Sequence, residues 1–548
     1  MDGSAWTLAG LCLCLFLCWA CVRHHRLGHL RRCGIPGPDP YFLIGNGPDL
    51  WRTNVLTVGR WIQRYGHVIA VWDFAPTVVV ADLELIRRIL VQDFHLFSMR
   101  RTILPHGGFA ADPEHEVSLI STDMPANRWK EQRSLITTAF TSSRIRDSVP
   151  LVNDAIDDLL QNFRDREKED NIEVYDLFQR FTMDTIGRWC FGIRMDVQKD
   201  PNNPLFRATK KFFDDFTKDW RQSLLILALM FPELTMLWYP LRRLESRILR
   251  LLGYPNHWTY QMDMCRNIVA LRKANIRDPN NPYSRDDLLQ RMIEATLTSE
   301  QMMSLQESNL TASDYIDDKE TLIRNARAKA GVKVHRMDDK EVAANASIFF
   351  DAGYETTSTL LAFLSHVLVN KPAIQERIRS EVQSLYERDR NLDYNTVNEL
   401  PFLDSVIFET LRLFPPITGA VTRQSSADYK WKGMTIPANT AICIPLYFLQ
   451  RDPDVWQDAE TFDPMRFYGA NKSRASSPSF QAFGFGPRNC IGLRFALMEA
   501  KLVVARLLLQ YYLVPGCKTA DFDRLEIHYK PITQNPGRGV FVRLIPVT

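Results

Sequence analysis

The chain has 548 residues, of which 45% are hydrophobic and 24% are charged, so it has ample apolar side chains to bury a large core. Its formal net charge of +3 excludes a bulk electrostatic basis for binding nucleic acid. Its ten cysteines are four in one apolar run near the start and six scattered ones, which argues against a disulfide framework and fits a reducing compartment. Length alone favours several domains.

The first predicted element is a single-pass membrane anchor. Residues 5–22 are apolar and contain no charge, and at about 1.5 Å per residue a helix over them is just long enough to span a bilayer. Positive charge follows this run and none precedes it, which places the bulk of the chain in the cytosol. A cleaved signal peptide is the alternative, but its basic residues would precede the run, and no small-residue cleavage site follows it. The basic residues after the run are Arg23, Arg26, Arg31 and Arg32.

An α/β stretch follows. Residues 34–40 read Gly-Ile-Pro-Gly-Pro-Asp-Pro, which cannot be a helix and predicts a stiff hinge between the anchor, residues 1–33, and the rest of the chain. Residues 68–72 and 77–81 are β-rich runs separated by a turn, and they predict a hairpin. Residues 83–90 have helical spacing.

Trp129 and Arg133 are four residues apart, which places them on one face of a predicted helix. Taken alone, this pair fits a surface helix with a half-buried tryptophan. Arg100 and Arg101 lie in the loop region that precedes this helix.

The middle of the chain, residues 149–270, has a largely helical pattern. Within it, residues 224–231 form an apolar run that is too short to span a membrane. The run predicts either a core helix or a flap that touches the membrane near a substrate entrance. Residues 297–337 are polar and irregular and predict a surface insertion, in which the glycosylation sequon at Asn309 should be silent on a cytosolic face.

Residues 338–370 predict one long helix, with acidic residues at its start and Lys371-Pro372 at its stop. Gly353 lies in the middle and costs about 1 kcal/mol relative to alanine, so something should require it. Small side chains at Ala352 and Gly353 would leave room for a flat ligand and for dioxygen, and Thr356 can bond back to the carbonyl of Ala352. An ordinary helix with a packing glycine is the alternative.

Glu409 and Arg412 place a carboxylate and a guanidinium on one helix face. As a lone pair they would form a surface salt bridge of little worth. A further arginine, Arg466, lies in the segment 462–467 that precedes the next motif.

Residues 483–492 read Phe-Gly-Phe-Gly-Pro-Arg-Asn-Cys-Ile-Gly, a loop of flexible glycines and a stiff proline before an apolar helical run at 493–509. Arg488 offers a cationic fork suited to a carboxylate. Cys490 stands at a helix start, where backbone amides favour a thiolate, which is a soft ligand for iron. A lone cysteine is otherwise a small buried hydrophobe. No second cysteine or histidine has zinc-ligand spacing.

These motifs together resemble the cytochrome P450 family. The cysteine loop matches the family's haem-binding signature, F-x-x-G-x-R-x-C-x-G, at every fixed position, and residues 352–357 resemble its oxygen-activation motif, A-G-x-[DE]-T-[TS]. The W-x-x-x-R and E-x-x-R pairs and the later arginine occur in the family's order, so the resemblance covers residues 34–548 as one large domain. The strings are most similar to animal microsomal members, in the branch of drug- and steroid-oxidising enzymes and thromboxane synthase.

The resemblance implies a mainly α fold with a smaller β region, a triangular helical domain that binds haem b. It implies Cys490 as the axial thiolate ligand of the haem iron and Glu355 and Thr356 as the catalytic pair. It implies a structural triad of Glu409, Arg412 and Arg466, which the nearby Met465, in place of a frequent glutamate, does not put in doubt. The implied haem-binding residues are Arg100, Trp129, Arg133, Arg423, Phe483, Arg488 and Cys490.

The implied activity is a monooxygenase that inserts one oxygen atom from O2 into a lipophilic substrate. The thiolate would push electron density toward the iron, and Glu355 and Thr356 would relay protons through water. NADPH would supply electrons through cytochrome P450 reductase, with cytochrome b5 as a further partner, at the endoplasmic reticulum membrane. Two alternatives are a haem-thiolate isomerase of lipid peroxides, against which the intact Glu355-Thr356 pair weighs, and a non-enzymatic haem sensor.

The segments expected to line the substrate site are mostly apolar, so the substrate is expected to be lipophilic, although the sequence does not identify it. These segments are residues 100–127, the region around Leu224, and residues 350–356, 416–421 and 532–536.

Overall fold

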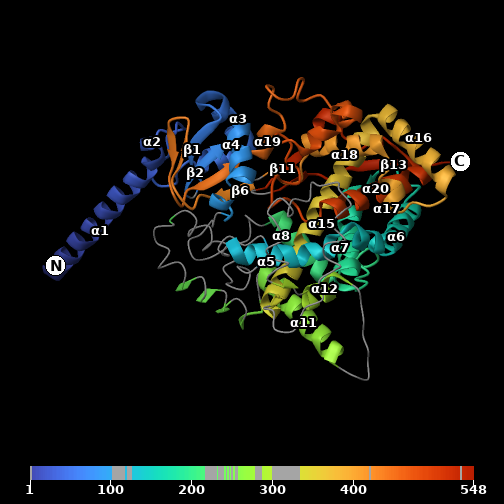
Figure 1. Cartoon of the computed structure of the whole chain (residues 1–548), viewed down its shortest axis with the longest axis horizontal. Coiled ribbons are helices and arrows are strands. Elements are labelled where there is room, and N and C mark those ends of the chain that lie inside the picture. Colours follow the sequence, from blue (N-terminus) through green and yellow to red (C-terminus); the bar gives the residue numbers. More distant parts are fainter. Residues whose placement is uncertain are drawn as a thin grey trace.

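The computed structural model describes residues 3–73, 75–100, 118–119, 126–215, 257–277, 287–295, 334–418, 421–530 and 533–547, with short stretches between residues 231 and 253 and at 297–298. Helices make up most of the described chain and strands form small sheets, which confirms the predicted mainly α fold with a smaller β region (Figure 1). The sheet of β1, β2 and β6 lies at the end of the molecule from which α1 extends, and α16 lies at the opposite end.

The α-helices are α1 (Gly3–Leu27), α2 (His29–Arg32), α3 (Gly47–Tyr65), α4 (Leu83–Arg87), α5 (Ala126–Thr137), α6 (Ser142–Asp165), α7 (Val174–Phe191), α8 (Pro204–Asp215), α11 (His257–Arg277), α12 (Leu288–Glu294), α15 (Asp339–Asn370), α16 (Pro372–Asp389), α17 (Tyr394–Val397), α18 (Pro401–Leu413), α19 (Leu446–Leu449) and α20 (Leu493–Gln510). The strands are β1 (Val68–Asp73), β2 (Ala75–Val80), β3 (Ile172–Glu173), β4 (Leu297–Thr298), β5 (Val334–His335), β6 (Val421–Gln424), β7 (Tyr429–Trp431), β8 (Met434–Ile436), β9 (Ala441–Ile444), β10 (Tyr511–Val514), β11 (Ile527–Tyr529), β12 (Gln534–Pro536) and β13 (Phe541–Pro546). Shorter π and 3-10 turns are η1 (Arg88–Gln92), η2 (Phe94–Leu96), η4 (Thr138–Phe140), η9 (Pro464–Phe467), η10 (Gly469–Ser476) and η11 (Phe522–Arg524).

The largest described sheet has the strand order β1-β2-β9-β6. β1 and β2 form the predicted antiparallel hairpin, in which Val68 pairs with Val80, and β2 then pairs parallel with β9. Both faces of this sheet are covered, since Val78, Val79 and Val80 are consecutive and all buried. The helix predicted over residues 83–90 is shorter than expected, because α4 ends at Arg87 and passes into a π-helical turn.

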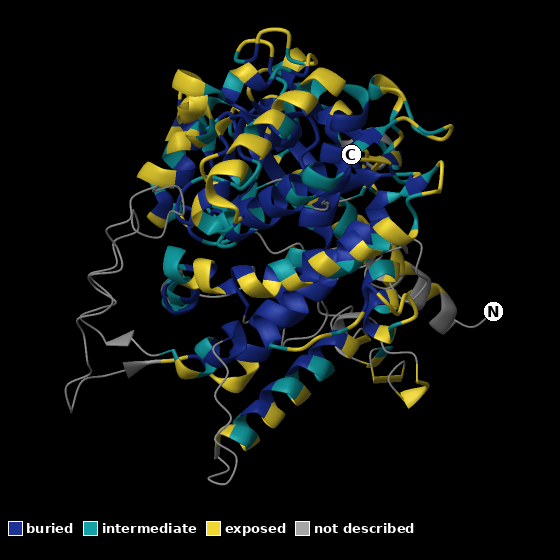
Figure 2. Cartoon of the chain, turned by 90° about the vertical axis from the view of Figure 1, so that its right-hand side faces the viewer, coloured by how far each residue is buried: buried dark blue, intermediate teal, exposed yellow. Residues whose placement is uncertain are grey.

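The predicted long helix is confirmed as α15, and it is the central element of the larger core. A capping box joins Asp338 and Glu341 at its start. From Glu341 to Val369 all its side chains are buried except three near the middle, a pattern typical of a helix surrounded by other elements. Figure 2 shows this division, with buried residues gathered in the interior and exposed ones on the outer helices. Helix α15 packs against α7, α11 and α20.

The segment predicted as an anchor is helical, and its C-terminal end packs beside the β1-β2-β9-β6 sheet. The Arg23 side chain is fully buried and donates to the carbonyl oxygens of Phe42 and Leu43 at 3.0 and 2.7 Å. Leu30 belongs to the core around the sheet. The non-helical segment 34–40 was predicted as a hinge, and it is held against β1 by a hydrogen bond from the Ala70 amide to the Pro36 carbonyl.

Among the residues that the structure describes, no helix combines the length and apolar character needed to cross a membrane.

Three predictions fall mostly outside the described residues. They are the apolar run at 224–231, of which only Phe231 is described, the insertion at 297–337 with Asn309, and the lining loop at 100–127.

Candidate functional site

The cysteine loop is folded by its own backbone. The Cys490 amide donates to the Phe483 carbonyl at 2.7 Å, and Gly484 and Gly486 adopt φ of +75° and +77°, a region that favours glycine. A Cβ atom on Gly486 would overlap the carbonyl oxygen of Leu90 in η1. The predicted need for glycine here therefore has a local cause, which is a left-handed backbone pressed against a neighbouring turn.

The Cys490 thiol is accessible but poorly solvated. Its side chain is exposed, yet the surrounding protein desolvates it enough to raise its pKa, while the Gly492 amide and Arg133 act to lower that pKa. The sequence predicted that backbone amides would favour the thiolate. They act in that direction, but burial outweighs them in the protein alone.

One face of α15 is open near its middle. Ala352 is exposed and Thr356 is partly exposed in an otherwise buried helix, and the Thr356 hydroxyl donates to the Ala352 carbonyl at 2.6 Å, as predicted. Phe140 connects this helix to the cysteine loop, because its ring lies 5.6 Å from that of Phe349 and it is the nearest side chain to the position of a Cβ on Gly492.

Gly353 is required by helix packing. A Cβ atom there would overlap the side chain of Ile186 on α7. The alternative of a packing glycine is therefore correct for Gly353, whereas Ala352 is the small residue that leaves open space beside the helix.

Four arginines predicted as haem contacts gather beside the loop. A hydrogen bond from the Gln424 amide to the Met99 carbonyl holds Arg100 next to β6, which carries Arg423. Burial and, to a smaller extent, the charge of Arg100 together lower the pKa of Arg423 to about 9. Burial also lowers the pKa of Arg133 to about 10, and it lowers that of Arg488, where the charges of Arg100, Arg423 and Arg133 add to the effect. Such mutual repulsion favours an anionic ligand among these side chains.

Helix α5 supplies two predicted residues to this cluster. Trp129 and Arg133 are both buried, so the interpretation of a surface helix is wrong. The Arg488 guanidinium lies 4.2 Å from the centre of the Trp129 ring, and Arg133 donates to the Asn489 side chain at 3.1 Å. The Nε atoms of Arg100, Arg423 and Arg488 are buried without a hydrogen-bond partner among the described residues.

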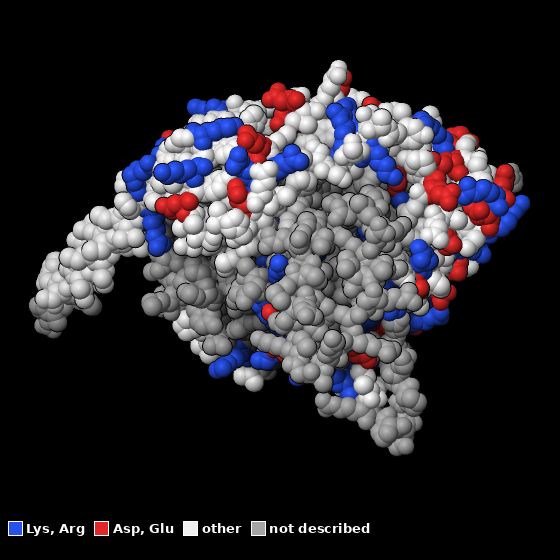
Figure 3. Space-filling view, viewed as in Figure 1, with Lys and Arg blue, Asp and Glu red and all other residues white. Residues whose placement is uncertain are grey.

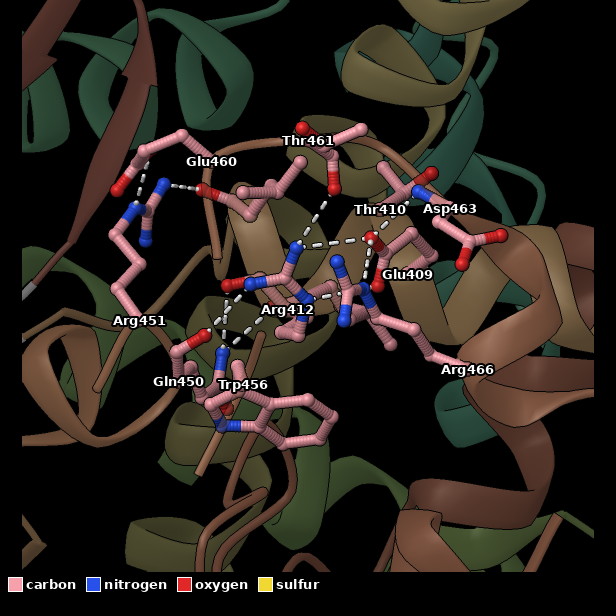
Figure 4. A network of polar contacts seen from close by, with 12 residues as sticks. Glu409, Thr410, Arg412, Gln450, Arg451, Trp456, Glu460, Thr461, Asp463 and Arg466 are labelled. Carbon is pink, nitrogen blue, oxygen red and sulfur yellow. Dashed lines mark hydrogen bonds and ion pairs between the residues drawn. The ribbon is translucent and has the colours of Figure 1, made fainter. Parts of the chain in front are cut away.

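Glu409, Arg412 and Arg466 come together in one buried network (Figure 4). Arg412 donates to both carboxylate oxygens of Glu409 at 2.8 and 2.9 Å, and Arg466 lies 3.5 Å from the same carboxylate. Arg412 also donates to the Gln450 and Thr461 carbonyls. The interpretation as a surface salt bridge is therefore wrong, and burial raises the pKa of Glu409 against the opposing effect of Arg412.

Glu355 faces away from the open face of α15. It is buried, and its carboxylate accepts hydrogen bonds from Tyr175 and Gln179 of α7 at 3.0 and 3.3 Å and from Asn535 of β12 at 3.1 Å, with Lys530 at 3.6 Å. These four partners were not predicted, because they lie more than a hundred residues from Glu355 and carry no motif.

Two segments predicted to line the substrate site are joined to each other. Ile417 and Thr533 form a β-bridge, and the Gln534 amide donates to the Pro416 carbonyl at 3.0 Å.

Comparison with known proteins decides the family. A family model described as Cytochrome P450 matches residues 35–531. The chain belongs to the cytochrome P450 family. It is 28% identical over 551 residues to Cytochrome P450 3A29 of Sus scrofa, covering 99% of this chain and 97% of the relative. It is 30% identical over 517 residues to Cytochrome P450 3A6 of Oryctolagus cuniculus, covering 92% and 90%, and 29% identical over 522 residues to Cytochrome P450 3A5 of Homo sapiens, covering 94% and 91%.

As a cytochrome P450 this protein is an oxidoreductase of the monooxygenase class, and the family implies a haem cofactor. The site fits that group. It offers an exposed but desolvated thiol, and buried arginine N–H groups that have no partner among the described residues and suit the two carboxylates that a haem carries. The isomerase alternative is not favoured.

Proposed function

We propose that this cytochrome P450 inserts one oxygen atom from O2 into a lipophilic substrate, with electrons from NADPH delivered through a flavoprotein reductase. The observation that carries the proposal is that Phe140 links the loop of the accessible Cys490 to α15, whose exposed face holds Ala352 and Thr356. Cytochrome b5 is a second candidate electron donor. The apolar lining segments support a lipophilic substrate.

The cofactor in this proposal is haem b, and Cys490 would supply the thiolate ligand of its iron. The cationic cluster would hold the propionates, and Phe483, whose carbonyl accepts from the Cys490 amide, would lie beside the ring. When bound, haem supplies the oxygen-activating redox chemistry. The residues proposed to hold the propionates are Arg100, Trp129, Arg133, Arg423 and Arg488.

The protein's own contribution is position and proton control. Thr356 presents a hydroxyl at the open face of α15, where it can hold a water molecule and pass a proton along it. Glu355, the residue before Thr356, is the proposed acid that supplies protons. The buried triad of Glu409, Arg412 and Arg466 is proposed to keep the segment before the cysteine loop in place.

The proposed location is the endoplasmic reticulum membrane, with residues 5–22 as the anchor and the catalytic domain in the cytosol. Residues 5–22 have no charged side chain, and basic residues follow them directly. Figure 3 shows lysine and arginine side chains gathered over the end of the molecule from which α1 extends, as a surface facing anionic lipid headgroups would require.

Spectroscopy and turnover together test the proposal. The reduced protein with bound carbon monoxide should show the red-shifted band of thiolate ligation, and Cys490→Ser should lose it. Steroids, fatty acids and xenobiotics are screened by spectral binding, and binders are incubated with NADPH and reductase. Oxygenated product that depends on both supports the proposal. Conversion of a lipid peroxide without reductase would support an isomerase, and a normal band in Cys490→Ser would overturn the ligand assignment.

A further inference from the structure

The hairpin of β11 and β12 holds the carboxylate of Glu355 from both of its strands. Lys530 directly follows β11, and its ammonium lies 3.6 Å from the Glu355 carboxylate. Asn535 lies in β12 and donates to the same carboxylate oxygen at 3.1 Å. Between them, the Lys530 amide donates to the Thr533 carbonyl at 2.8 Å and closes the turn.

The same hairpin carries a segment expected to contact the substrate. Thr533 forms the β-bridge to Ile417, and the Gln534 amide bonds the Pro416 carbonyl. Residues 416–418 and 533–536 are therefore one hydrogen-bonded unit on the side of α15 where Glu355 is held. A displacement of this unit by a bound molecule would move Lys530 and Asn535 directly.

The other side of the carboxylate is fixed by α7. Tyr175 donates its hydroxyl to Glu355 at 3.0 Å and also accepts from Asn535 at 3.2 Å, so the three side chains form a closed triangle. Burial raises the pKa of Tyr175 well above its ordinary value, and the Glu355 carboxylate raises it further, so the phenol stays protonated and remains a donor. Gln179 adds a weaker contact at 3.3 Å.

Exposure shows how this network reaches water. Glu355, Tyr175 and Asn535 are buried, whereas the Lys530 side chain is 17% exposed. Lys530 is thus the member of the network that stands at its edge. Thr356, the next residue on α15, is partly exposed, whereas the Glu355 carboxylate contacts the hairpin.

We propose that Asn535, Lys530 and Tyr175 are positioning residues that set the orientation of Glu355, and that the substrate acts on this orientation through the hairpin. This inference rests on the proposed monooxygenase function and on Glu355 as its acid. When a substrate presses on the hairpin, the hold on Glu355 changes, and proton supply to the Thr356 side follows substrate occupancy. The share of NADPH converted into product then depends on how each substrate contacts residues 533–536.

The first test needs no turnover. Amide hydrogen exchange of residues 527–536 is measured in haem-loaded full-length protein for the wild type, Tyr175→Phe and Glu355→Gln. Loss of one hydrogen bond to a charged group changes a local equilibrium by about tenfold or more, so exchange in the hairpin should accelerate by about tenfold. Tyr529→Phe is the matched control, because Tyr529 lies on the same hairpin but its hydroxyl contacts Tyr447 of α19 and not Glu355, so exchange should stay near the wild-type rate. Unchanged exchange in both network variants would overturn the proposal.

The second test measures coupling. Asn535→Leu and Tyr175→Phe should keep haem content and the carbon monoxide spectrum, while product per NADPH falls about tenfold and released peroxide rises. Thr356→Ala serves as the reference variant in which NADPH consumption is expected to be fully uncoupled from product formation. Because Asn535 acts through Glu355, the double variant Asn535→Leu with Glu355→Gln should be no worse than Glu355→Gln alone. Additive losses, or unchanged coupling in both single variants, would contradict a positioning role. Absence of product from wild-type protein would instead refute the proposed function, since the exchange experiment stands independently of turnover.

Discussion

Glu409 and Arg412 lie one turn apart on α18, and two hydrogen bonds of 2.8 and 2.9 Å join their charged groups with both side chains fully buried. The Asp463 amide donates to the same carboxylate at 2.8 Å, which ties the segment before the cysteine loop to this helix. Removing one residue of such a buried pair strongly lowers the free energy of unfolding, because the remaining charge stays buried without its partner.

We expect Glu409→Ala or Arg412→Ala to lower the free energy of unfolding by about 3–5 kcal/mol and to give little haem-loaded protein. Haem content and thermal unfolding of the purified protein measure this. The matched control is Arg388→Ala, which breaks the exposed Arg388–Glu399 pair and should change neither quantity appreciably. A fully haem-loaded Glu409→Ala protein with wild-type stability would show that the network is dispensable.

Gly353→Ala should destabilise the contact between α15 and α7. The added methyl group overlaps Ile186, and overpacking of a tight core costs about 1–3 kcal/mol, more than the gain of about 1 kcal/mol in helix propensity. Thermal unfolding measures the effect. Combining Gly353→Ala with Ile186→Ala should cost less than the sum of the two changes, because the new methyl fills the space that isoleucine leaves. Gly59→Ala in α3 is the control, since its Cβ would meet only Phe448 at an ordinary 3.4 Å. Additive losses would refute this packing role.

These two sites show what the sequence could predict. The hairpin of β1 and β2, the extent of α15 and the spacing of Glu409 and Arg412 are local patterns, and the structure confirms them. The sequence could not decide whether Gly353 makes room for a ligand or for a neighbouring helix, because Ile186 lies in another helix far away in the chain. The same holds for Glu355, whose partners on α7 and β12 are brought to it only by tertiary packing. The burial of Trp129 and Glu409 likewise could not be predicted from the sequence, because elements elsewhere in the chain cover them.

Glu499 predicts a pH dependence of stability. It is buried on α20 beside Thr185, and burial raises its pKa to about 8. The folded protein therefore binds this proton more tightly than the unfolded chain, whose glutamate has a pKa of about 4.3. Below about pH 4.3 Glu499 is protonated in both the folded and the unfolded protein, so its burial does not lower the free energy of unfolding. As the pH rises from there to about 8, the unfolded chain ionises this group more readily, and the free energy of unfolding falls progressively.

We expect Glu499→Gln to flatten this dependence and to raise stability at pH 8 by a few kcal/mol relative to wild type, with little difference near pH 5. Unfolding midpoints of both proteins at several pH values from 5 to 8 measure it. Parallel curves for the two proteins would show that Glu499 is not the group responsible.

The N-terminal segment gives the last prediction. All the proposed haem-site residues lie after residue 34, so chains lacking residues 1–22 or 1–30 should both bind haem and should lose membrane attachment that resists high salt and alkaline pH. The shorter truncation keeps Arg23, which is fully buried, donates to two carbonyls and lies 5.4 Å from the centre of the Trp72 ring. The longer one removes it together with the buried Leu30, so it should unfold at a lower temperature than the shorter one. Arg26→Ala in the full chain is the control, since Arg26 is exposed and should change neither property. Loss of haem in the shorter truncation, or unchanged wash-resistant attachment in both, would contradict the assignment of residues 5–22 as an anchor outside the catalytic fold.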